Sequence, residues 1–222
     1  MTRAYISLNG EWTFHGPNGS VEQVNIPHTW NGKDGQDDGN EEFDPEKQRV
    51  YLEFQGVNST ADVEINGSLT VHHDGGYSTF RADITEMLQE ENRLTVRVDN
   101  SVNDRVYPQK ADFTFYGGIY RDVALIVVSQ NHFVLDYFGG KGIKITPKLE
   151  KGCGKIHVET FVTGTGTVEI SLLDADGKQV ASGEGRDIVL DIPDVHLWNG
   201  LDDPYLYRAV ARLVKDDEVV DQ

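Results

Sequence analysis

The sequence has very little cysteine, and this scarcity excludes two kinds of site. Its 222 residues include one cysteine, Cys153, which cannot form an internal disulfide or a zinc cage built from cysteines. The seven histidines form no HExxH or HxH pattern. His72 and His73 are adjacent, and neighbours on a strand point to opposite faces, which argues against a shared metal ion. We expect no metal site in this chain.

Long apolar runs and basic residues are also scarce. No run approaches the roughly 20 apolar residues that span a membrane, and the start of the chain lacks the apolar stretch of a secretory signal. The 20 basic residues face 37 acidic ones, so the net charge is −17, with −11 in residues 1–130 and −6 in residues 131–222. Neither part has the basic surface that binds nucleic acid or anionic lipid. The composition predicts a cytoplasmic protein without these partners.

Motifs that carry chemistry by themselves are missing as well. The sequence has no GxSxG, no phosphate-binding P-loop and no GxGxxG before a helix. Its many acids guarantee chance carboxylate pairs, but only a structure gives the separations on which glycoside hydrolysis depends. The densest acidic run, Asp34–Glu46, is typical of a solvated loop. No segment is a self-sufficient active site.

What the sequence does have is regular alternation of apolar and polar residues. This period of two is typical of half-buried strands. The expected strands include 49–54, 61–65, 93–98, 155–162, 167–173 and 187–192. Asn66-Gly67 and Asp176-Gly177 separate alternating segments, which favours hairpins, because a type I′ turn needs positive φ at both central residues. Only Asp83–Asn92 resembles a helix, of one or two turns. The expected fold class is all-β.

The expected strands fall into two groups, which predicts two β-sandwiches in series. The first group occupies residues 1–130, and a glycine-rich connector follows it. Residues 131–222 then hold short strands at spacings of about 8–12 residues, as in a sandwich.

Aromatic residues in turn-rich segments suggest a carbohydrate ligand. Sugar C–H faces stack on aromatic rings, while sugar hydroxyl groups bond to carboxylates and amides. The candidates are Trp30, Tyr77, Tyr107, Phe113, Phe115 and Tyr116. The alternative for each ring is a place in a sandwich core. The segment from Asp112 to Asp122 combines aromatics and acids with two glycines, which allow a sharp turn or a close approach to a ligand.

Six segments occur in order along the chain: LNGEWTF (8–14), NIPHTWN (25–31), LEFQGVNSTADVEING (52–67), HHDGGYSTFRADIT (72–85), LTVRVDNS (94–101) and FYGGIYRDVALI (115–126). Together they resemble the amino-terminal sugar-binding domain of glycoside hydrolase family 2, and within it the bacterial β-galactosidases. HLWNGLDDPYLYRAV (196–210) is similar to a signature near the end of the immunoglobulin-like domain that follows in this family. Trp198 in this segment is expected to be buried in the second core.

The resemblance implies a jelly-roll sugar-binding domain in residues 1–130 and an immunoglobulin-like domain, truncated at its end, in residues 131–222. A (β/α)₈ barrel with two catalytic glutamates follows in the family. This sequence lacks that barrel, and Asn40-Glu41 is not its Asn-Glu-Pro motif. The chain alone is expected to be inactive and without a cofactor. The complete enzyme is expected to hydrolyse terminal β-galactosides with retention, to use Mg²⁺ or Na⁺, and to form a homo-oligomer.

The resemblance implies two sugar-binding residues. Asp122 matches the family aspartate that projects toward sugar hydroxyls, and Asn40 is the nearest match to an asparagine in an early loop. After residues 34–44 the sequence departs from the family, because a strand with Tyr-Arg-Gly and Trp-Tyr-Arg is missing and one sheet is left a strand short. The alternative for Asp122 is a structural ion pair with Arg121.

Two other functions stay open at this point. One is a free-standing carbohydrate-binding module, and the other is a structural module that helps such an enzyme to oligomerise. A binding module should bind sugar alone, whereas part of an enzyme pocket should bind weakly, because pockets need convergent groups from several elements. For a complete enzyme, β-glucuronidase and β-mannosidase are alternative activities.

Overall fold

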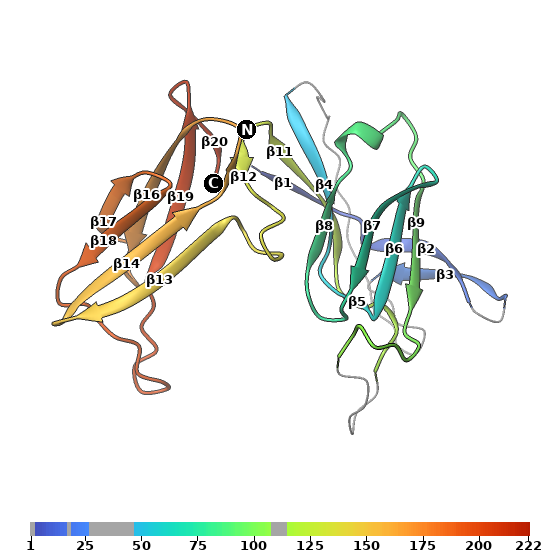
Figure 1. Cartoon of the computed structure of the whole chain (residues 1–222), viewed down its shortest axis with the longest axis horizontal. Helices are drawn as coiled ribbons and strands as arrows, with labels where there is room; N and C mark the ends of the chain where they lie inside the picture. Colours follow the sequence, from blue (N-terminus) through green and yellow to red (C-terminus); the bar gives the residue numbers. More distant parts are fainter. Residues whose placement is uncertain (1–2, 17–18, 27–46, 108–114) are drawn as a thin grey trace. The chain divides into compact units, whose positions relative to one another are not determined.

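The computed structural model (Figure 1) describes residues 3–16, 19–26, 47–107 and 115–222. These residues are all-β, which confirms the expected fold class. They form two compact units: an amino-terminal unit, Ala4–Val127, and a carboxy-terminal unit, Val128–Gln222, which also takes in Arg3. No helix among the described residues is long and apolar enough to cross a membrane.

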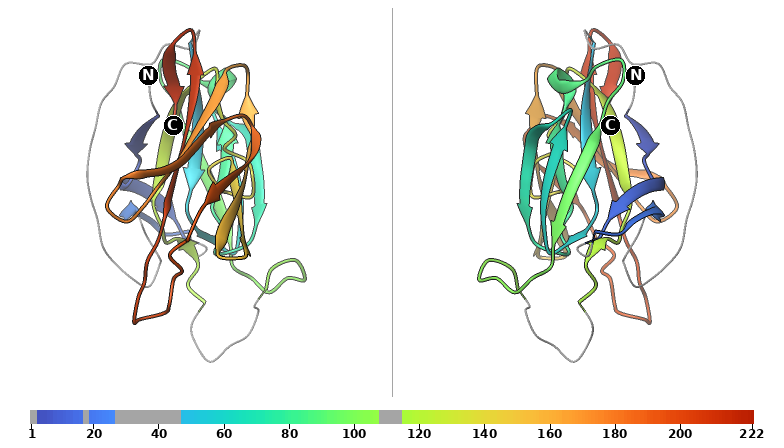
Figure 2. Two further views of the ribbon diagram at one scale, coloured as in Figure 1. Left: turned by 90° about the vertical axis from the view of Figure 1, so that its left-hand side faces the viewer. Right: turned by 90° about the vertical axis from the view of Figure 1, so that its right-hand side faces the viewer.

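The strands of the amino-terminal unit are, in chain order, β1 (Ala4–Ser7), β2 (Gly10–His15), β3 (Val21–Ile26), β4 (Gln48–Phe54), β5 (Val57–Asn58), β6 (Thr60–Ile65), β7 (Ser68–Asp74), β8 (Phe80–Asp83), β9 (Leu94–Asp99), β10 (Gly118–Ile119) and β11 (Val123–Ser129). One sheet has the order β1-β11-β4-β8, and a second has the order β7-β6-β9. Two further ladders join β2 to β3 and β5 to β10. The sheets are seen from two sides in Figure 2.

Alternation along the strands builds the core of the amino-terminal unit. Every second residue of β4 is buried in one cluster with every second residue of β6, so the two sheets share this core. The members from these two strands are Val50, Leu52, Phe54, Ala61, Val63 and Ile65. The Phe54 ring stacks on that of Phe80, with centroids 5.0 Å apart. The sequence period of two therefore becomes an apolar face on each sheet.

The strands of the carboxy-terminal unit are β12 (His132–Phe133), β13 (Ile143–Glu150), β14 (Cys153–Thr160), β15 (Val162–Thr163), β16 (Thr167–Leu173), β17 (Gln179–Glu184), β18 (Asp187–Ile192), β19 (Arg208–Lys215) and β20 (Glu218–Asp221). They form sheets of order β13-β14-β18 and β17-β16-β19-β20, and a β12-β15 ladder. Alternate residues of β16, Val168, Ile170 and Leu172, enter the core. The expectation for Trp198 was wrong: this side chain is 62% exposed.

The turns follow the sequence signals with one difference. Asn66 and Gly67 both have positive φ, 53° and 82°, as a type I′ turn between β6 and β7 requires. At the second predicted hairpin turn, Asp176-Gly177, only Gly177 has positive φ. The Gly177 N–H donates to the Asp174 carbonyl at 3.0 Å, so the loop is wider than the expected two-residue turn. The helix-like segment contains a single 3₁₀ turn, Thr85–Met87.

An ion pair fixes Arg3 to the carboxy-terminal unit. The Arg3 guanidinium donates to both carboxylate oxygens of Asp221, at 2.7 and 2.8 Å, and to the Phe133 carbonyl at 2.9 Å. Asp221 also accepts from the Phe133 N–H at 2.7 Å. The two charged side chains are 8% and 1% exposed. This buried pair ties the first described residue to the last strand, β20.

Candidate functional site

Asp122 lies in the connection between β10 and β11, and its side chain is exposed. Its Oδ1 accepts a hydrogen bond from Asn9 Nδ2 at 3.0 Å. The Asn9 Oδ1 in turn accepts from the Val123 N–H at 3.0 Å, and the Gln55 N–H donates to the Asp122 carbonyl at 3.0 Å. Asn9 thus holds the carboxylate, and the bond from Gln55 fixes the backbone of the same residue. Among the described residues, the second oxygen, Oδ2, has no partner and faces solvent.

The alternative role for Asp122 was a structural ion pair with Arg121. Among the described residues, Arg121 forms no such ion pair with Asp122 and bonds elsewhere. Its guanidinium donates to the carbonyls of Tyr77, at 3.1 Å, and Gln55, at 3.5 Å. The same group lies 5.3 Å from the centroid of the Tyr120 ring, within cation–π range. The charge of Asp122 is therefore left for solvent or a ligand.

Two tyrosines lie beside Arg121. The Tyr77 and Tyr120 rings meet edge to face with centroids 6.4 Å apart. The Tyr120 hydroxyl donates to the Gly76 carbonyl, and burial raises the pKa of Tyr120, so this donor stays protonated at neutral pH. Tyr77 is 48% exposed and presents its ring to solvent. We call Asn9, Tyr77, Tyr120, Arg121 and Asp122 the Asp122 cluster.

Glycine at position 76 allows the close packing behind this cluster. A Cβ on Gly76 would collide with the Asn58 side chain. Asn58 is buried and donates from Nδ2 to the Tyr116 carbonyl at 2.7 Å, which links β5 to the segment before β10. Gly76 is the second glycine of the segment HHDGGYSTF, and its close approach to Asn58 is the physical reason for a glycine there.

The other aromatic candidates have mixed outcomes. Tyr107 and Tyr116 are 81% and 50% exposed, so like Tyr77 they do not fill the core, and Phe115 is half-buried. Trp30, Phe113 and Asn40 lie outside the described residues, so the structure places neither these two rings nor the second predicted sugar-binding residue. Of the predicted residues that the structure describes, Tyr77 lies against Arg121, which is the chain neighbour of Asp122.

Sequence reasoning missed the partners of Asp122. Asn9 lies 113 residues away in the chain, and its only signal was its place in the LNGEW segment. Tyr120 and Arg121 were visible in GIYRD, but nothing in the sequence shows that their side chains turn back toward the 75–77 turn. All these contacts are tertiary: those of Tyr120 and Arg121 follow from the pairing of β10 with β5, and that of Asn9 follows from the pairing of β1 with β11.

The described residues form no cation site by themselves. They contain no group of three or more histidine, cysteine, aspartate or glutamate side chains close enough to hold a metal ion. Mg²⁺ takes six oxygen ligands and keeps several of them as water, and among the described residues of the Asp122 cluster Asp122 is the one that could supply a carboxylate oxygen.

The two adjacent histidines have opposite environments. His72 is exposed on β7 and bonds through Nδ1 to Asp62 at 2.7 Å, while its Nε2 lies 3.4 Å from Asp74. These hydrogen bonds, that of Asp62 first, raise the pKa of His72. His73 points the other way and stacks on Phe80 at 4.1 Å, and burial lowers its pKa. The expectation that they point to opposite faces is confirmed.

The raised pKa of His72 predicts a pH-dependent contribution to stability. Folding favours its protonated form, so this stabilisation is complete below the unfolded pKa of about 6.5 and is lost as pH rises through the folded pKa. We expect His72→Gln to reduce the free energy of unfolding more at pH 5.5 than at pH 8.5, as measured by urea titration. Because the wild-type and variant proteins both contain His73, its contribution to the pH dependence cancels in the difference between them. A difference between the proteins that does not change with pH would contradict this assignment.

Two models of domain families match the chain. The "Glycosyl hydrolases family 2, sugar binding domain" matches residues 40–129, and "Glycosyl hydrolases family 2" matches residues 141–222. The chain belongs to glycoside hydrolase family 2. The expected family is thereby confirmed, and the Asp122 cluster lies within the sugar-binding domain of this family 2 chain.

Known relatives of this family 2 chain are longer than it is. A Bacteroides fragilis β-glucuronidase is 35% identical over 256 aligned residues, which take in 99% of this chain and 36% of the relative. A Thermoanaerobacter pseudethanolicus β-galactosidase is 28% identical, over 78% of this chain and 25% of its own length. The crystal structure of an FMN-binding β-glucuronidase from Faecalibacterium prausnitzii L2-6 is 40% identical with a TM-score of 0.89, over 99% of this chain and 38% of that one. The chain thus spans well under half of each.

Proposed function

We propose that these residues are a non-catalytic part of a family 2 β-glycosidase and that Asp122 accepts hydrogen bonds from hydroxyl groups of the sugar substrate. The observation that carries the proposal is the geometry of Asp122, an exposed residue whose Oδ1 is held by Asn9 while Oδ2 has no partner among the described residues. A preoriented carboxylate is a strong acceptor for hydroxyl donors, because its charge shortens and strengthens the bond. The edge-on tyrosine pair beside the neighbouring Arg121 offers an apolar ring surface of the kind that sugars contact.

The proposed substrate is a terminal β-glucuronide. Support comes from the two relatives at 35% and 40% identity, both named β-glucuronidase. The sequence-based expectation of a β-galactoside has support from the T. pseudethanolicus enzyme and from a putative B. fragilis β-galactosidase of known structure, 32% identical with a TM-score of 0.86. None of these four relatives is named as a β-mannosidase, so they give no support to a β-mannoside.

Hydrolysis assays test this proposal on two proteins. We expect the 222-residue chain to hydrolyse neither 4-nitrophenyl β-D-glucuronide nor the corresponding β-D-galactoside, because no residue in it matches the catalytic glutamates and binding alone supplies no proton transfer. We expect the complete enzyme that contains this chain to hydrolyse the glucuronide, and to do so with a higher kcat/KM than it shows on the galactoside.

The outcomes separate the parts of the proposal. A higher kcat/KM on the galactoside would favour the sequence-based expectation of a β-galactosidase, without contradicting the assignment to a family 2 glycosidase. Turnover by the 222-residue chain, abolished by a point mutation within it, would overturn its non-catalytic role. Titration calorimetry with glucuronate and galactose tests the free-standing module, which requires saturable binding to the chain alone.

A further inference from the structure

Five asparagines of the sequence are each followed by glycine, and such a pair has a chemistry of its own. The backbone nitrogen of the glycine can attack Cγ of the asparagine, because glycine has no Cβ to crowd the approach. Hydroxide takes the amide proton, the new bond from nitrogen to Cγ closes a cyclic imide, and the bond from Cγ to Nδ2 breaks. The leaving nitrogen takes a proton from water and departs as ammonia. Water then opens the imide to aspartate or isoaspartate, so a neutral amide becomes a carboxylate.

Three of these pairs lie in the described part of the chain, and they begin at Asn9, Asn66 and Asn199. The other two begin at Asn18 and Asn31, which lie outside the described residues. The three described glycines are alike: each has positive φ, and a Cβ at any of them would meet no atom within 4 Å beyond its chain neighbours. Crowding at the attacking nitrogen therefore does not distinguish the three pairs. The hold on the asparagine side chain does.

The Asn66 side chain is held by three hydrogen bonds. Its Nδ2 donates to the Met87 carbonyl and to Asn92 Oδ1, both at 3.0 Å, and its Oδ1 accepts from the Arg93 N–H at 2.8 Å. Both polar atoms of the amide are thus engaged by the segment before β9. The side chain cannot turn its Cγ toward the nitrogen of Gly67 unless these bonds break.

The Asn9 side chain is held by two hydrogen bonds. Its Nδ2 donates to the Asp122 carboxylate and its Oδ1 accepts from the Val123 N–H, both at 3.0 Å. The first of these is strengthened by the charge of the acceptor. Deamidation of Asn9 would replace this donor by a second carboxylate opposite Asp122, so the folded state opposes the reaction here as well.

Asn199 is held through its backbone alone. It is exposed in the connection between β18 and β19, a long loop in Figure 1, where its N–H donates to the Asp203 carbonyl at 2.7 Å and its carbonyl accepts from the Asp203 N–H at 3.2 Å. Among the described residues, no group forms a hydrogen bond with its side-chain amide. The neighbouring Trp198 and Leu201 are 62% and 101% exposed, so water and hydroxide have access to this part of the loop.

We propose that Asn199 is a site of spontaneous deamidation in the folded chain, and that hydrogen bonds to the side chains of Asn9 and Asn66 protect these two residues. The reaction consumes water and requires no enzyme. Its product adds a carboxylate to a loop that already contains Asp202 and Asp203. The isoaspartate form also adds one backbone carbon between the bridged positions 199 and 203. The proposal is independent of the proposed function, since it concerns no sugar.

Peptide mapping by mass spectrometry tests this proposal, because it follows each Asn-Gly pair of the 222-residue chain separately. During incubation at mildly alkaline pH, we expect the Asn199 peptide to gain the mass of the acid at least about tenfold faster than the Asn9 and Asn66 peptides. The reason is that two or three side-chain hydrogen bonds must break at each protected site, and together they slow the attack by about tenfold or more. In urea that unfolds the chain, this protection is lost, and the three rates should converge.

The matched variant is Asn199→Gln. Glutamine keeps an amide at this exposed position, but its longer side chain would have to close a larger ring that forms more slowly. We expect no acid product at position 199 in this variant, with unchanged rates at Asn9 and Asn66.

The proposal is wrong if Asn199 reacts no faster than Asn9 and Asn66 in the folded chain. It is equally wrong if Asn199 reacts in urea but not in the folded chain, because the loop would then hold its side chain. Rates that stay as far apart in urea as in the folded chain would show that the local sequence sets them, and would remove the protective role of the hydrogen bonds.

Discussion

Asp221→Asn should lower the free energy of unfolding of the carboxy-terminal unit by about 3–5 kcal/mol. The Asp221 side chain is 1% exposed, and both its oxygens accept from the Arg3 guanidinium. Asparagine keeps the shape but removes the negative charge that faces the buried Arg3 guanidinium. Urea unfolding, followed through the exchange of β19 and β20 amides to select this unit, measures the loss.

The matched control is Asp191→Asn in the same unit. Asp191 pairs with Lys155 at 2.5 Å, but its side chain is 52% exposed and that of Lys155 is 35% exposed. Surface pairs of this kind contribute about 0–1 kcal/mol, because water screens both charges. Equal, small losses for the two variants would show that the buried position of Asp221 has no special weight. Arg3→Met provides the reciprocal test, since it leaves Asp221 as the unpaired charge.

Asp122→Asn should reduce kcat/KM of the complete enzyme about ten- to a hundredfold. A hydrogen bond to a charged acceptor contributes about 1.5–3 kcal/mol, and each 1.4 kcal/mol is a factor of ten in rate. Asparagine can still accept from Asn9 through Oδ1, so the local fold should not change. We therefore expect the melting temperature of the 222-residue chain to stay within about 1 °C of the wild-type value.

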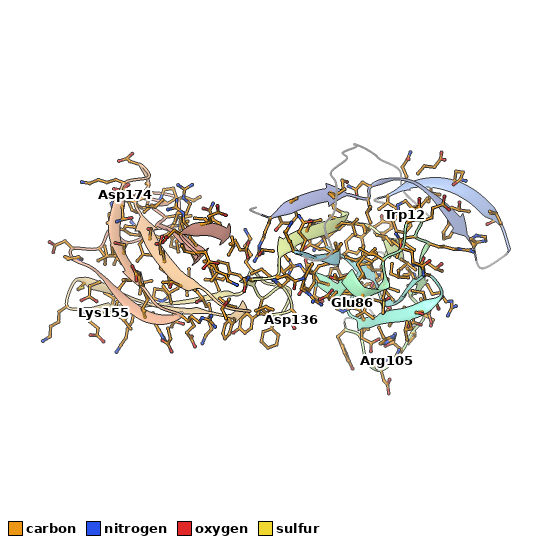
Figure 3. The ribbon with its side chains drawn as sticks, turned by 90° about the horizontal axis from the view of Figure 1, so that it is seen from above. Trp12, Glu86, Arg105, Asp136, Lys155 and Asp174 are labelled. Carbon is orange, nitrogen blue, oxygen red and sulfur yellow. The ribbon has the colours of Figure 1, made fainter. Side chains whose placement is uncertain are left out.

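A suitable control for Asp122→Asn is Glu86→Gln, in the 3₁₀ turn beyond the other end of β8 from Tyr77. This exposed residue, labelled in Figure 3, should affect neither kcat/KM nor stability. An unchanged kcat/KM for Asp122→Asn would remove Asp122 from the sugar site. A lower melting temperature with unchanged kinetics would instead make it a structural residue.

Local patterns predicted the strands well because their cause is local. The alternation in residues 167–173 and 187–192 gives strands β16 and β18 with these same bounds. Asn66-Gly67 forms the expected turn because the turn type depends only on the φ angles of these two residues. The period of two depends on the pleat of a single strand, and a sequence carries that information in adjacent residues.

Side-chain environments were predicted less well because they depend on distant segments. Trp198 has a large apolar side chain of the kind that often fills a core, yet it lies in a loop. In this loop the His196 ring bonds to Asp203 at 2.6 Å and stacks on the Tyr205 ring at 3.9 Å. That pairing orders the loop without burying the indole. Asp122 was identified through family resemblance, whereas its partner Asn9 required the register of β1 with β11, which alternation alone does not reveal.

The Arg3–Asp221 pair also has a consequence for synthesis of the chain. Its two members are 218 residues apart, so one sandwich is assembled from both ends of the described chain, with the other sandwich between them. At about 5–20 residues per second, Arg3 leaves the ribosome roughly 10–40 s before Asp221. The intervening unit has this time to fold, whereas the carboxy-terminal unit must wait. A ribosome stalled after β19 should therefore carry one protease-resistant unit and one that is still open to cleavage.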